Sequence, residues 1–396
     1  MDLKIFTDNI EQEALDQIHT LLSQDAFKDS KVRIMPDVHA GKGCVIGFTA
    51  DLGKKVVPNL VGVDIGCGVS VYELGNIDID FEKLDKVIHE YVPSGREVHS
   101  STMHPFVELQ NLHCYRELRD TKRLVRSIGT LGGGNHFIEV DTDEDGNKYL
   151  LIHTGSRNLG KQVAEYYQNL AYDLMCGKDK LFEQQDALIK EYKEQGRRSE
   201  IEGALKKLRA EFVAEHPTIP KDLCYLEGKY RQMYLDDMYI CQNFAYFNRL
   251  TIANIILEKM GWDCIDWFES VHNYIDFDKN LVRKGAISAT KGERLIIPIN
   301  MRDGAIIGIG KGKPDWNWSA PHGAGRLMSR MKARETLSMT DYAKSMDGIY
   351  TTSVSLDTID EAPMAYKPIE EIVKNIEPTV KIEKIIKPLY NFKASE

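Results

Sequence analysis

The chain contains no long apolar run. Across its 396 residues, no stretch approaches the ~18 consecutive apolar residues that a membrane-spanning helix needs. The first residues, Met1-Asp2-Leu3-Lys4, lack the basic and apolar pattern of a secretory signal. We therefore expect a cytoplasmic protein with no membrane partner.

The sequence also lacks a disulfide framework and an excess of positive charge. Its seven cysteines are an odd number without regular spacing, which fits reduced thiols better than disulfides. The 51 lysines and arginines face 60 aspartates and glutamates, and the net charge of -9 argues against non-specific coating of nucleic acid. An RNA or DNA partner would have to be held by a local basic patch or by bound metal.

The composition that remains is that of a globular protein, with 42% hydrophobic and 28% charged residues. No internal repeat or low-complexity linker divides the chain, so we predict one domain over residues 1–396. A strongly charged stretch at about 177–222 predicts a helical hairpin inserted in that domain. A longer helix should follow it, with apolar and aromatic residues at helical spacing and an end near Gly261.

A short loop places a carboxylate and a thiol three residues apart. It reads Val61-Gly62-Val63-Asp64-Ile65-Gly66-Cys67-Gly68, and its glycines allow a tight turn in which Asp64 and Cys67 could face one ion. Taken alone, the same pattern also fits a small buried thiol and a turn-forming aspartate. The metal interpretation gains weight because four histidines occur downstream in glycine-rich or polar segments, at His136, His153, His272 and His322.

The pattern around these histidines predicts strands that end near one another. We expect paired strands over residues 43–48 and 56–60 to lead into the Asp64 loop, and a strand over 69–74 to leave it. A triple glycine precedes Asn135 and His136, and the Asp145-Gly146 turn predicts a hairpin that brings His136 and His153 to the same end of a sheet. The triple glycine is either a plain turn or a phosphate cradle.

Two further segments carry candidate catalytic groups. Asp37 follows a predicted strand over 32–35, in a polar loop that is either a surface turn or the position of a carboxylate that orients a histidine. His322 lies in a loop of small residues before the helical pattern of residues 327–336. If Asp64, Cys67, His136, His153 and His272 form a two-metal centre with a bridging thiolate, His322 remains available as a nucleophile.

Together these motifs resemble one family. In chain order, from Pro36 to Lys393, they read PDVHAGKG, VGVDIGCG, GGGNHFIEV, HTGSRNLG, HN, RKGA, HGAGRLMSR and DEAPMAYK. The sequence is similar to the RtcB family of GTP-dependent RNA ligases, also called tRNA-splicing or 3′-phosphate/5′-hydroxyl ligases. The resemblance implies an α+β fold with mixed or antiparallel sheets and surrounding helices. It also implies the use of two Mn2+ per chain, GTP, and RNA ends that carry a 2′,3′-cyclic phosphate or 3′-phosphate and a 5′-hydroxyl.

The resemblance also implies residue roles. His322, oriented by Asp37, would attack the α-phosphate of GTP to form a guanylyl-histidine. The two metals would be bound by Asp64, Cys67, His136, His153 and His272. The guanylate pocket would be lined by Asn135, Phe137, Glu139, Asn273, Asn300, Ala324, Gly325, Tyr366 and Lys393. RNA or triphosphate oxygens would be held by Arg157, Lys284, Arg326 and Arg330.

The sequence departs from the family pattern at one motif. Where the family usually has Pro-Gly-Ser-Met and a further serine, this chain has Asn300 and Ala305, so two hydroxyl groups are replaced and we expect weaker affinity for GTP. Cysteine and histidine ligands would also suit Zn2+, whereas the family implies Mn2+. Two other classes fit the same motifs: a two-metal phosphatase or nuclease, which has no need of His322, and a non-catalytic protein that binds RNA ends.

Overall fold

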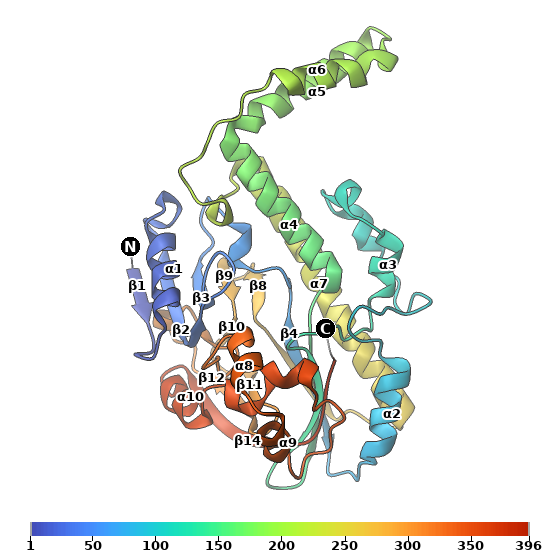
Figure 1. Ribbon diagram of the computed structural model, residues 1–396, viewed down its shortest axis with the longest axis vertical. Helices are drawn as coiled ribbons and strands as arrows, with labels where there is room; N and C mark the ends of the chain where they lie inside the picture. Colours follow the sequence, from blue (N-terminus) through green and yellow to red (C-terminus); the bar gives the residue numbers. More distant parts are fainter. Residues whose placement is uncertain (1, 395–396) are drawn as a thin grey trace.

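The computed structural model describes residues 2–394, and a seven-stranded sheet lies at its centre (Figure 1). Each strand of this sheet pairs antiparallel with its neighbours. In spatial order the strands are β11 (Arg294–Asn300), β12 (Gly304–Gly310), β14 (Val380–Lys393), β5 (Phe137–Thr142), β6 (Lys148–Thr154), β4 (Gly68–Gly75) and β7 (Asp266–Val271). The β5–β6 hairpin is the one that the Asp145-Gly146 turn predicted.

A second, five-stranded sheet pairs β1 and β2 in parallel and its other neighbours antiparallel. Its strands in spatial order are β1 (Asp2–Ile5), β2 (Lys31–His39), β3 (Ile46–Asp51), β9 (Leu281–Lys284) and β8 (Asn273–Asp276). A small third sheet pairs β10 (Ala286–Ser288) with β13 (Ser319–Pro321).

Helices surround these sheets, so the predicted α+β class is confirmed. They are α1 (Gln12–Leu22), α2 (Phe81–Tyr91), α3 (Thr121–Arg126), α4 (Arg157–Asp173), α5 (Asp179–Glu194), α6 (Ile201–Glu211), α7 (Gly228–Met260), α8 (Arg330–Thr336), α9 (Met339–Ser345) and α10 (Ile369–Ile376). In Figure 1, α5 and α6 run side by side and project away from the sheets. The long helix α7 ends where predicted, because Gly261 adopts a left-handed conformation (φ 73°). Among the helices described, none is both long and apolar enough to cross a bilayer.

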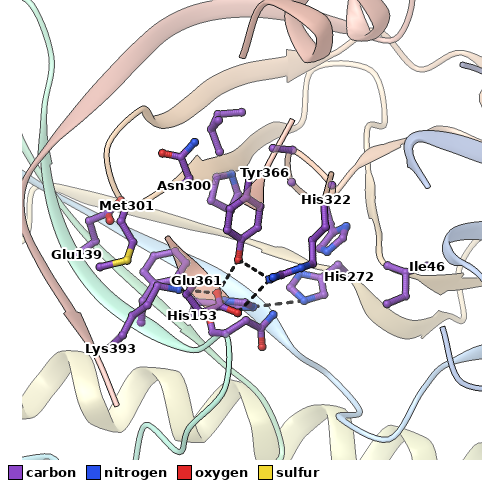
Figure 2. Close-up of a pocket in the computed structure, with 18 of the residues that line it drawn as sticks. Ile46, Glu139, His153, His272, Asn300, Met301, His322, Glu361, Tyr366 and Lys393 are labelled. Carbon is purple, nitrogen blue, oxygen red and sulfur yellow. Dashed lines mark hydrogen bonds and ion pairs between the residues drawn. The ribbon is translucent and has the colours of Figure 1, made fainter. Parts of the chain in front are cut away.

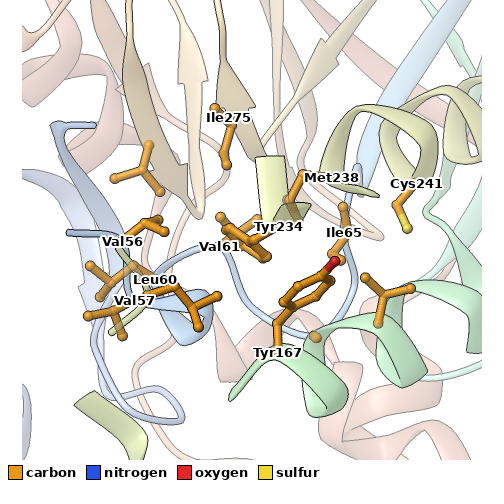
Figure 3. Packing of buried hydrophobic residues seen from close by; sticks show 14 of the residues in the cluster. Val56, Val57, Leu60, Val61, Ile65, Tyr167, Tyr234, Met238, Cys241 and Ile275 are labelled. Carbon is orange, nitrogen blue, oxygen red and sulfur yellow. The ribbon is translucent and has the colours of Figure 1, made fainter. Parts of the chain in front are cut away.

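The largest apolar cluster anchors the segment that leads to Asp64. Figure 3 shows Val57, Leu60 and Val61 of this segment near Tyr167 of α4 and Tyr234 of α7. All five of these side chains are buried. Burying a large apolar side chain stabilises a fold by about 1.5–3 kcal/mol, so several such residues fix the path of the segment firmly.

One part of this segment differs from the prediction. Residues 56–60 do not form a strand: Val56 makes a single bridge to Leu226, and a 3-10 turn follows over Pro58–Leu60. Pro58 has no backbone N–H to donate to a neighbouring strand, and its fixed φ suits the first turn of a helix. The alternating apolar pattern therefore reflects burial against helices rather than strand pairing.

The position of Asp37 also differs from the prediction. Strand β2 does not stop at residue 35 but continues through Pro36 and Asp37 to His39. The pairing of β2 with β3 is interrupted between Ile34 and His39, so Pro36 lies where no hydrogen bond to β3 is required of it. Asp37 is consequently held by a buried strand, with its side chain fully buried.

A buried arginine joins the strands on which the metal-ligand candidates lie. The Arg249 guanidinium, from α7, is 1% exposed and pairs with Glu269 of β7 at 2.9 Å. It also donates to the carbonyl oxygens of Gly66 (2.7 Å) and Thr154 (3.0 Å) and to the Ser70 hydroxyl (3.1 Å). One side chain therefore ties α7 to β4, β6, β7 and the loop before β4.

Replacing this arginine should destabilise the whole fold. Arg249→Met would leave Glu269 without its cation and two buried carbonyl groups without a donor. We expect the free energy of unfolding to fall by about 3 kcal/mol, measured by denaturant titration.

Arg294→Met is the matched control. Arg294 also joins two carboxylates, Glu73 at 2.7 Å and Asp266 at 2.9 Å, but its side chain is 31% exposed. Because exposed ion pairs contribute little, its loss should cost no more than about 1 kcal/mol. Equal losses in the two variants would show that Arg249 does not have the role described.

Candidate metal and nucleotide site

The Asp64–Gly68 loop approaches its neighbours so closely that only glycine fits at two positions. Gly66 has φ 72°, and an added Cβ would lie 2.7 Å from the Cβ of Ala245 on α7. At Gly68 an added Cβ would lie 2.8 Å from the carbonyl oxygen of Ser270 on β7. The backbone N–H of Cys67 donates to the Asp64 carbonyl at 3.2 Å and closes the turn. The two glycines therefore allow the carboxylate and the thiol to reach one region between α7 and β7.

The structure brings all five metal-ligand candidates together. The Cys67 Sγ lies 3.5 Å from His136 Nε2 and 3.4 Å from His153 Nε2. His136 Nε2 lies 2.9 Å from an Asp64 oxygen, and His153 Nε2 lies 3.4 Å from His272 Nε2. Two groups have all their ligand atoms within 4.8 Å of one another, one of Asp64, Cys67 and His136 and one of Cys67, His153 and His272. Cys67 belongs to both groups, so its sulfur would be a ligand common to both if each group held an ion.

Hydrogen bonds outside this cluster orient two of the imidazoles. His136 Nδ1 lies 2.9 Å from the Leu131 carbonyl oxygen, and His153 Nδ1 lies 3.1 Å from that of Asn135. A carbonyl only accepts, so Nδ1 carries a proton in each ring and Nε2 faces the cluster. Burial lowers the pKa values of His153 and His272 well below the usual range, which keeps these rings neutral. Neutral nitrogens that face a thiol and a carboxylate fit a divalent cation.

His322 is held by Asp37. Its Nδ1 lies 2.6 Å from Asp37 Oδ2, and its backbone N–H donates to the same oxygen at 3.1 Å. The contact depends on Gly325 (φ 74°), where an added Cβ would lie 2.6 Å from the Asp37 carbonyl oxygen. The carboxylate fixes a proton on Nδ1, which leaves Nε2 as the ring nitrogen that Asp37 does not engage. The rings of His322 and His272 have centroids 4.8 Å apart, so this nitrogen belongs to the same site as the metal-ligand cluster.

A pocket opens next to His322 (Figure 2). It is lined by residues from β5, β14, the β11–β12 turn and the loops that precede α8 and α10. The predicted nucleotide residues that line it are Asn135, Phe137, Glu139, Asn300, Ala324, Gly325, Tyr366 and Lys393. Asn273 does not line it: its amide donates to the Asp64 carbonyl (3.3 Å) and accepts from the Gly285 N–H (3.0 Å). Asn273 therefore supports the metal loop.

The pocket contains a carboxylate that sequence reasoning did not single out. Glu361 accepts from Tyr366 OH (2.5 Å) and Lys393 Nζ (3.1 Å), and it pairs with Arg326 (3.3 Å) and Arg330 (3.4 Å). Burial opposes its charge, but Lys393, Arg330 and Arg326 hold its pKa down at about 2. Glu361 lies within the DEAPMAYK motif, so the motif was the available signal. The carboxylate links side chains predicted to hold the nucleotide with those predicted to hold phosphate.

The four predicted phosphate-binding cations divide into two sets. Arg326 and Arg330 line the pocket, whereas Arg157 and Lys284 do not. Lys284 is 5% exposed and donates to the carbonyl oxygens of Lys42 (2.6 Å) and Cys44 (2.9 Å), so it holds a backbone loop.

Arg157 lines a separate groove. Its side chain donates to the Thr130 hydroxyl (3.2 Å) and the Gly95 carbonyl oxygen (3.1 Å). The groove around it has more cations than anions, with Arg96, Arg119, Arg123 and Lys161 against Glu97 and Asp120. It is a local basic surface in an acidic protein, of the kind that an RNA partner would require.

The two positions that depart from the family pattern face different surroundings. Asn300 lines the pocket, but its amide closes the β11–β12 turn: Oδ1 accepts from the N–H groups of Arg302 (3.0 Å) and Asp303 (2.9 Å). Ala305 is fully buried in an apolar cluster with Phe137 and Ile307 and does not line the pocket. Only Asn300 is placed to affect a bound nucleotide directly.

Comparison with known proteins agrees with this arrangement. The chain matches the family described as tRNA-splicing ligase RtcB over residues 21–394. It is 28% identical to the RNA-splicing ligase RtcB of Escherichia coli (strain K12), with 86% of this chain and 85% of that protein covered. It is 27% identical to the tRNA-splicing ligase RtcB of Archaeoglobus fulgidus, with 92% and 87% covered, and 26% identical to that of Nanoarchaeum equitans, with 86% and 83% covered. Because the family match spans nearly the whole chain, the protein belongs to the tRNA-splicing ligase RtcB family.

Proposed function

We propose that the protein is a metal- and GTP-dependent RNA ligase that joins a 3′-phosphate or 2′,3′-cyclic phosphate end to a 5′-hydroxyl end. Its family and its relatives are named as RNA-splicing ligases, which supports an enzyme that joins RNA. The observation that carries the proposal is the position of His322, between a cluster of metal ligands and a pocket with cationic side chains. A phosphatase or nuclease has no need of an imidazole held by a buried carboxylate at that point.

In the first step, Nε2 of His322 attacks the α-phosphorus of GTP. A P–N bond forms, the bond to the β-phosphate oxygen breaks, and pyrophosphate leaves. The imidazole becomes positively charged as the bond forms, and Asp37 at 2.6 Å stabilises that charge. Two divalent ions, which the family implies to be Mn2+, would be held by the cluster around Cys67 and supply positive charge for the phosphate oxygens. Arg326, Arg330 and Lys393 also line the pocket, where they can hold further oxygens.

In the later steps, the guanylyl group moves from His322 to the 3′-phosphate of the RNA. The 5′-hydroxyl then attacks that phosphorus, a phosphodiester forms, and GMP leaves. A 2′,3′-cyclic end must first be opened to the 3′-phosphate by water. The basic groove around Arg157 provides a surface for the RNA backbone.

One experiment separates this proposal from its alternatives. The protein is incubated with Mn2+ and GTP labelled on the α-phosphate, and the denatured protein is then treated with acid. An acid-labile protein-bound label is expected, because P–N bonds to histidine hydrolyse in acid. A protein that cleaves RNA ends without labelling would instead be a phosphatase or nuclease, and one that only binds ends would be an accessory protein.

Removal of the shared thiol should release both metal ions. In Cys67→Ala each group of ligands loses its sulfur, so we expect two tightly bound Mn2+ per chain in the parent and fewer than one in the variant, measured as metal content after gel filtration. Guanylylation should be lost while the melting temperature of the metal-free protein is retained. Cys264→Ala, at the exposed cysteine, is the control and should keep both ions. Two ions retained in Cys67→Ala would disprove the bridging role.

Removal of the nucleophile should block only the first step. His322→Ala should take up no label from GTP, yet it should join an RNA whose 3′-phosphate already carries GMP, since that step uses the metal site and the aligned 5′-hydroxyl. The yield of joined RNA on a denaturing gel is the measurement. Covalent label on the variant would mean that another residue is the nucleophile.

Serine substitutions at the two departing positions should behave differently. Asn300→Ser offers the pocket a hydroxyl, so affinity for GTP should rise by about the net value of one hydrogen bond, ~0.5–1.5 kcal/mol. Ala305→Ser places a hydroxyl in an apolar cluster, so it should leave GTP affinity unchanged and lower the free energy of unfolding by about 1 kcal/mol. Titration of guanylylation against GTP, with ATP as control nucleotide, measures the affinity. Tighter GTP binding in Ala305→Ser would place residue 305 in the nucleotide site.

A further inference from the structure

Strand β5 carries a second buried carboxylate next to Glu139. Side chains alternate between the faces of a strand, so Phe137, Glu139 and Asp141 share the face that borders the pocket. Across the ladder these three face His153, Leu151 and Tyr149 of β6. Glu139 is 3% exposed and lines the pocket. Asp141, the next residue on the same face of the strand, is 0% exposed. Two acidic groups therefore follow one another from the wall of the pocket into the protein interior.

The two carboxyl groups have unequal partners. Glu139 accepts a hydrogen bond from the Asn391 amide of β14. Neither oxygen of Asp141 meets a donor from the described residues, and Glu139 is its neighbour on the same face of the strand. Two ionised carboxylates in this position would repel each other, and Asp141 would be a buried charge without a partner. One proton held between them turns the repulsion into an O–H···O⁻ hydrogen bond.

The surroundings decide which group holds the proton. Lys393, from β14, acts on Glu139 and favours its charged form together with Asn391. Lys387, also from β14, is the cation that favours the charged form of Asp141. On β6, the residues across the ladder from Glu139 and Asp141 are Leu151 and Tyr149. Burial, and next to it the charge of Glu139, raises the pKa of Asp141 well above its usual range, whereas burial raises the pKa of Glu139 to about 7. Asp141 is therefore the group that keeps the proton.

We propose that Asp141 is a positioning residue of the nucleotide pocket, which donates its proton in a hydrogen bond to Glu139 and so keeps Glu139 as an ionised acceptor for the base. This inference rests on the proposed use of GTP. The guanine edge presents two neighbouring donors, the N1–H and the exocyclic amine, and a carboxylate accepts from both. Adenine has no N1–H, so a charged Glu139 favours guanine, and a protonated Glu139 does not.

Two substitutions separate proton donation from simple packing. Asp141→Asn keeps a donor, from its amide, and removes the second acid, so Glu139 should stay ionised to lower pH than in the parent. Asp141→Leu keeps the branched shape and the number of side-chain heavy atoms but has no donor. Nothing at residue 141 then stabilises the charge of buried Glu139, so the pKa of Glu139 should rise. GTP binding weakens as the pH falls and Glu139 becomes protonated. The pH at which affinity for GTP is lost should therefore be lower in Asp141→Asn than in the parent, and higher in Asp141→Leu. Near pH 7, Asp141→Leu should bind GTP about tenfold or more weakly.

The experiment has one readout with GTP and one without it. Dissociation constants for GTP and ATP are measured with Mn2+ on the full chain across the pH range around 7, and melting temperatures confirm that each variant is folded. In the absence of nucleotide, infrared difference spectra at neutral pH should show the C=O stretch of a protonated carboxylic acid in the parent but not in Asp141→Asn. Asp143→Asn is the control and should keep this band, because hydrogen bonds from Asn147, Lys384 and Tyr149 outweigh burial and hold the pKa of Asp143 far below its usual range.

The possible outcomes are distinct. If the acid side moves in the same direction in both Asp141 variants, or if the infrared band survives Asp141→Asn, Asp141 does not hold a shared proton and the inference is wrong. If the parent binds no GTP, the proposed function and the role of Asp141 in base recognition both fail, while the infrared spectra still report whether the proton is shared.

Discussion

The structure depends on bringing several lone pairs to one place. Three imidazole nitrogens, a thiol and a carboxylate form two groups that share Cys67, each with its ligand atoms within 4.8 Å, and a divalent cation would offset the repulsion between their lone pairs. The sheet order makes the arrangement possible: β4 lies between β6 and β7, so Cys67 before β4, His153 near the end of β6 and His272 after β7 meet at one edge. The Arg249 guanidinium then fixes the backbone next to Cys67 and His153 by donating to the carbonyl oxygens of Gly66 and Thr154. The apolar side chains of α4 and α7 also pack against the segment that leads to Asp64, so they help to fix its position.

The second sheet contributes the carboxylate that holds His322 at that edge. Asp37 belongs to β2 of the five-stranded sheet, and His322 follows β13, yet a 2.6 Å contact joins them. Since Asp37 also accepts from the His322 backbone, the carboxylate fixes both the loop and the ring tautomer. A small change in how the sheets meet would therefore move His322 relative to the metal-ligand candidates. The geometry on which the proposed reaction depends is thus set by how the sheets pack.

Local sequence signals predicted the elements that depend on local chemistry. The Asp145-Gly146 turn predicted the β5–β6 hairpin, and Gly261 predicted the end of α7. The motifs predicted which side chains gather around Cys67 and His322. The sequence did not show where a side chain points when its neighbours come from distant parts of the chain. Ala305 faces an apolar cluster because of its place in the β12 ladder, and Lys284 turns to the carbonyls of residues 42 and 44 because that loop folds over it. The role of Glu361 depends on cations that come from separate segments of the chain.

Under the proposed function, the pocket has two charged regions for different parts of a nucleotide. Glu139, which lines the pocket, is the acceptor for a base with N–H donors, and Asp141 lies behind it. Arg326, Arg330 and Lys393 form the donor region, but Glu361 already neutralises part of their charge. The remaining positive charge of these side chains is small for a triphosphate, so in the proposed reaction most of the neutralisation would come from cations at the Cys67 cluster. The proposal therefore couples nucleotide binding to metal binding by electrostatics, and it leaves selectivity for the base to Glu139, whose charge state depends on its buried neighbours.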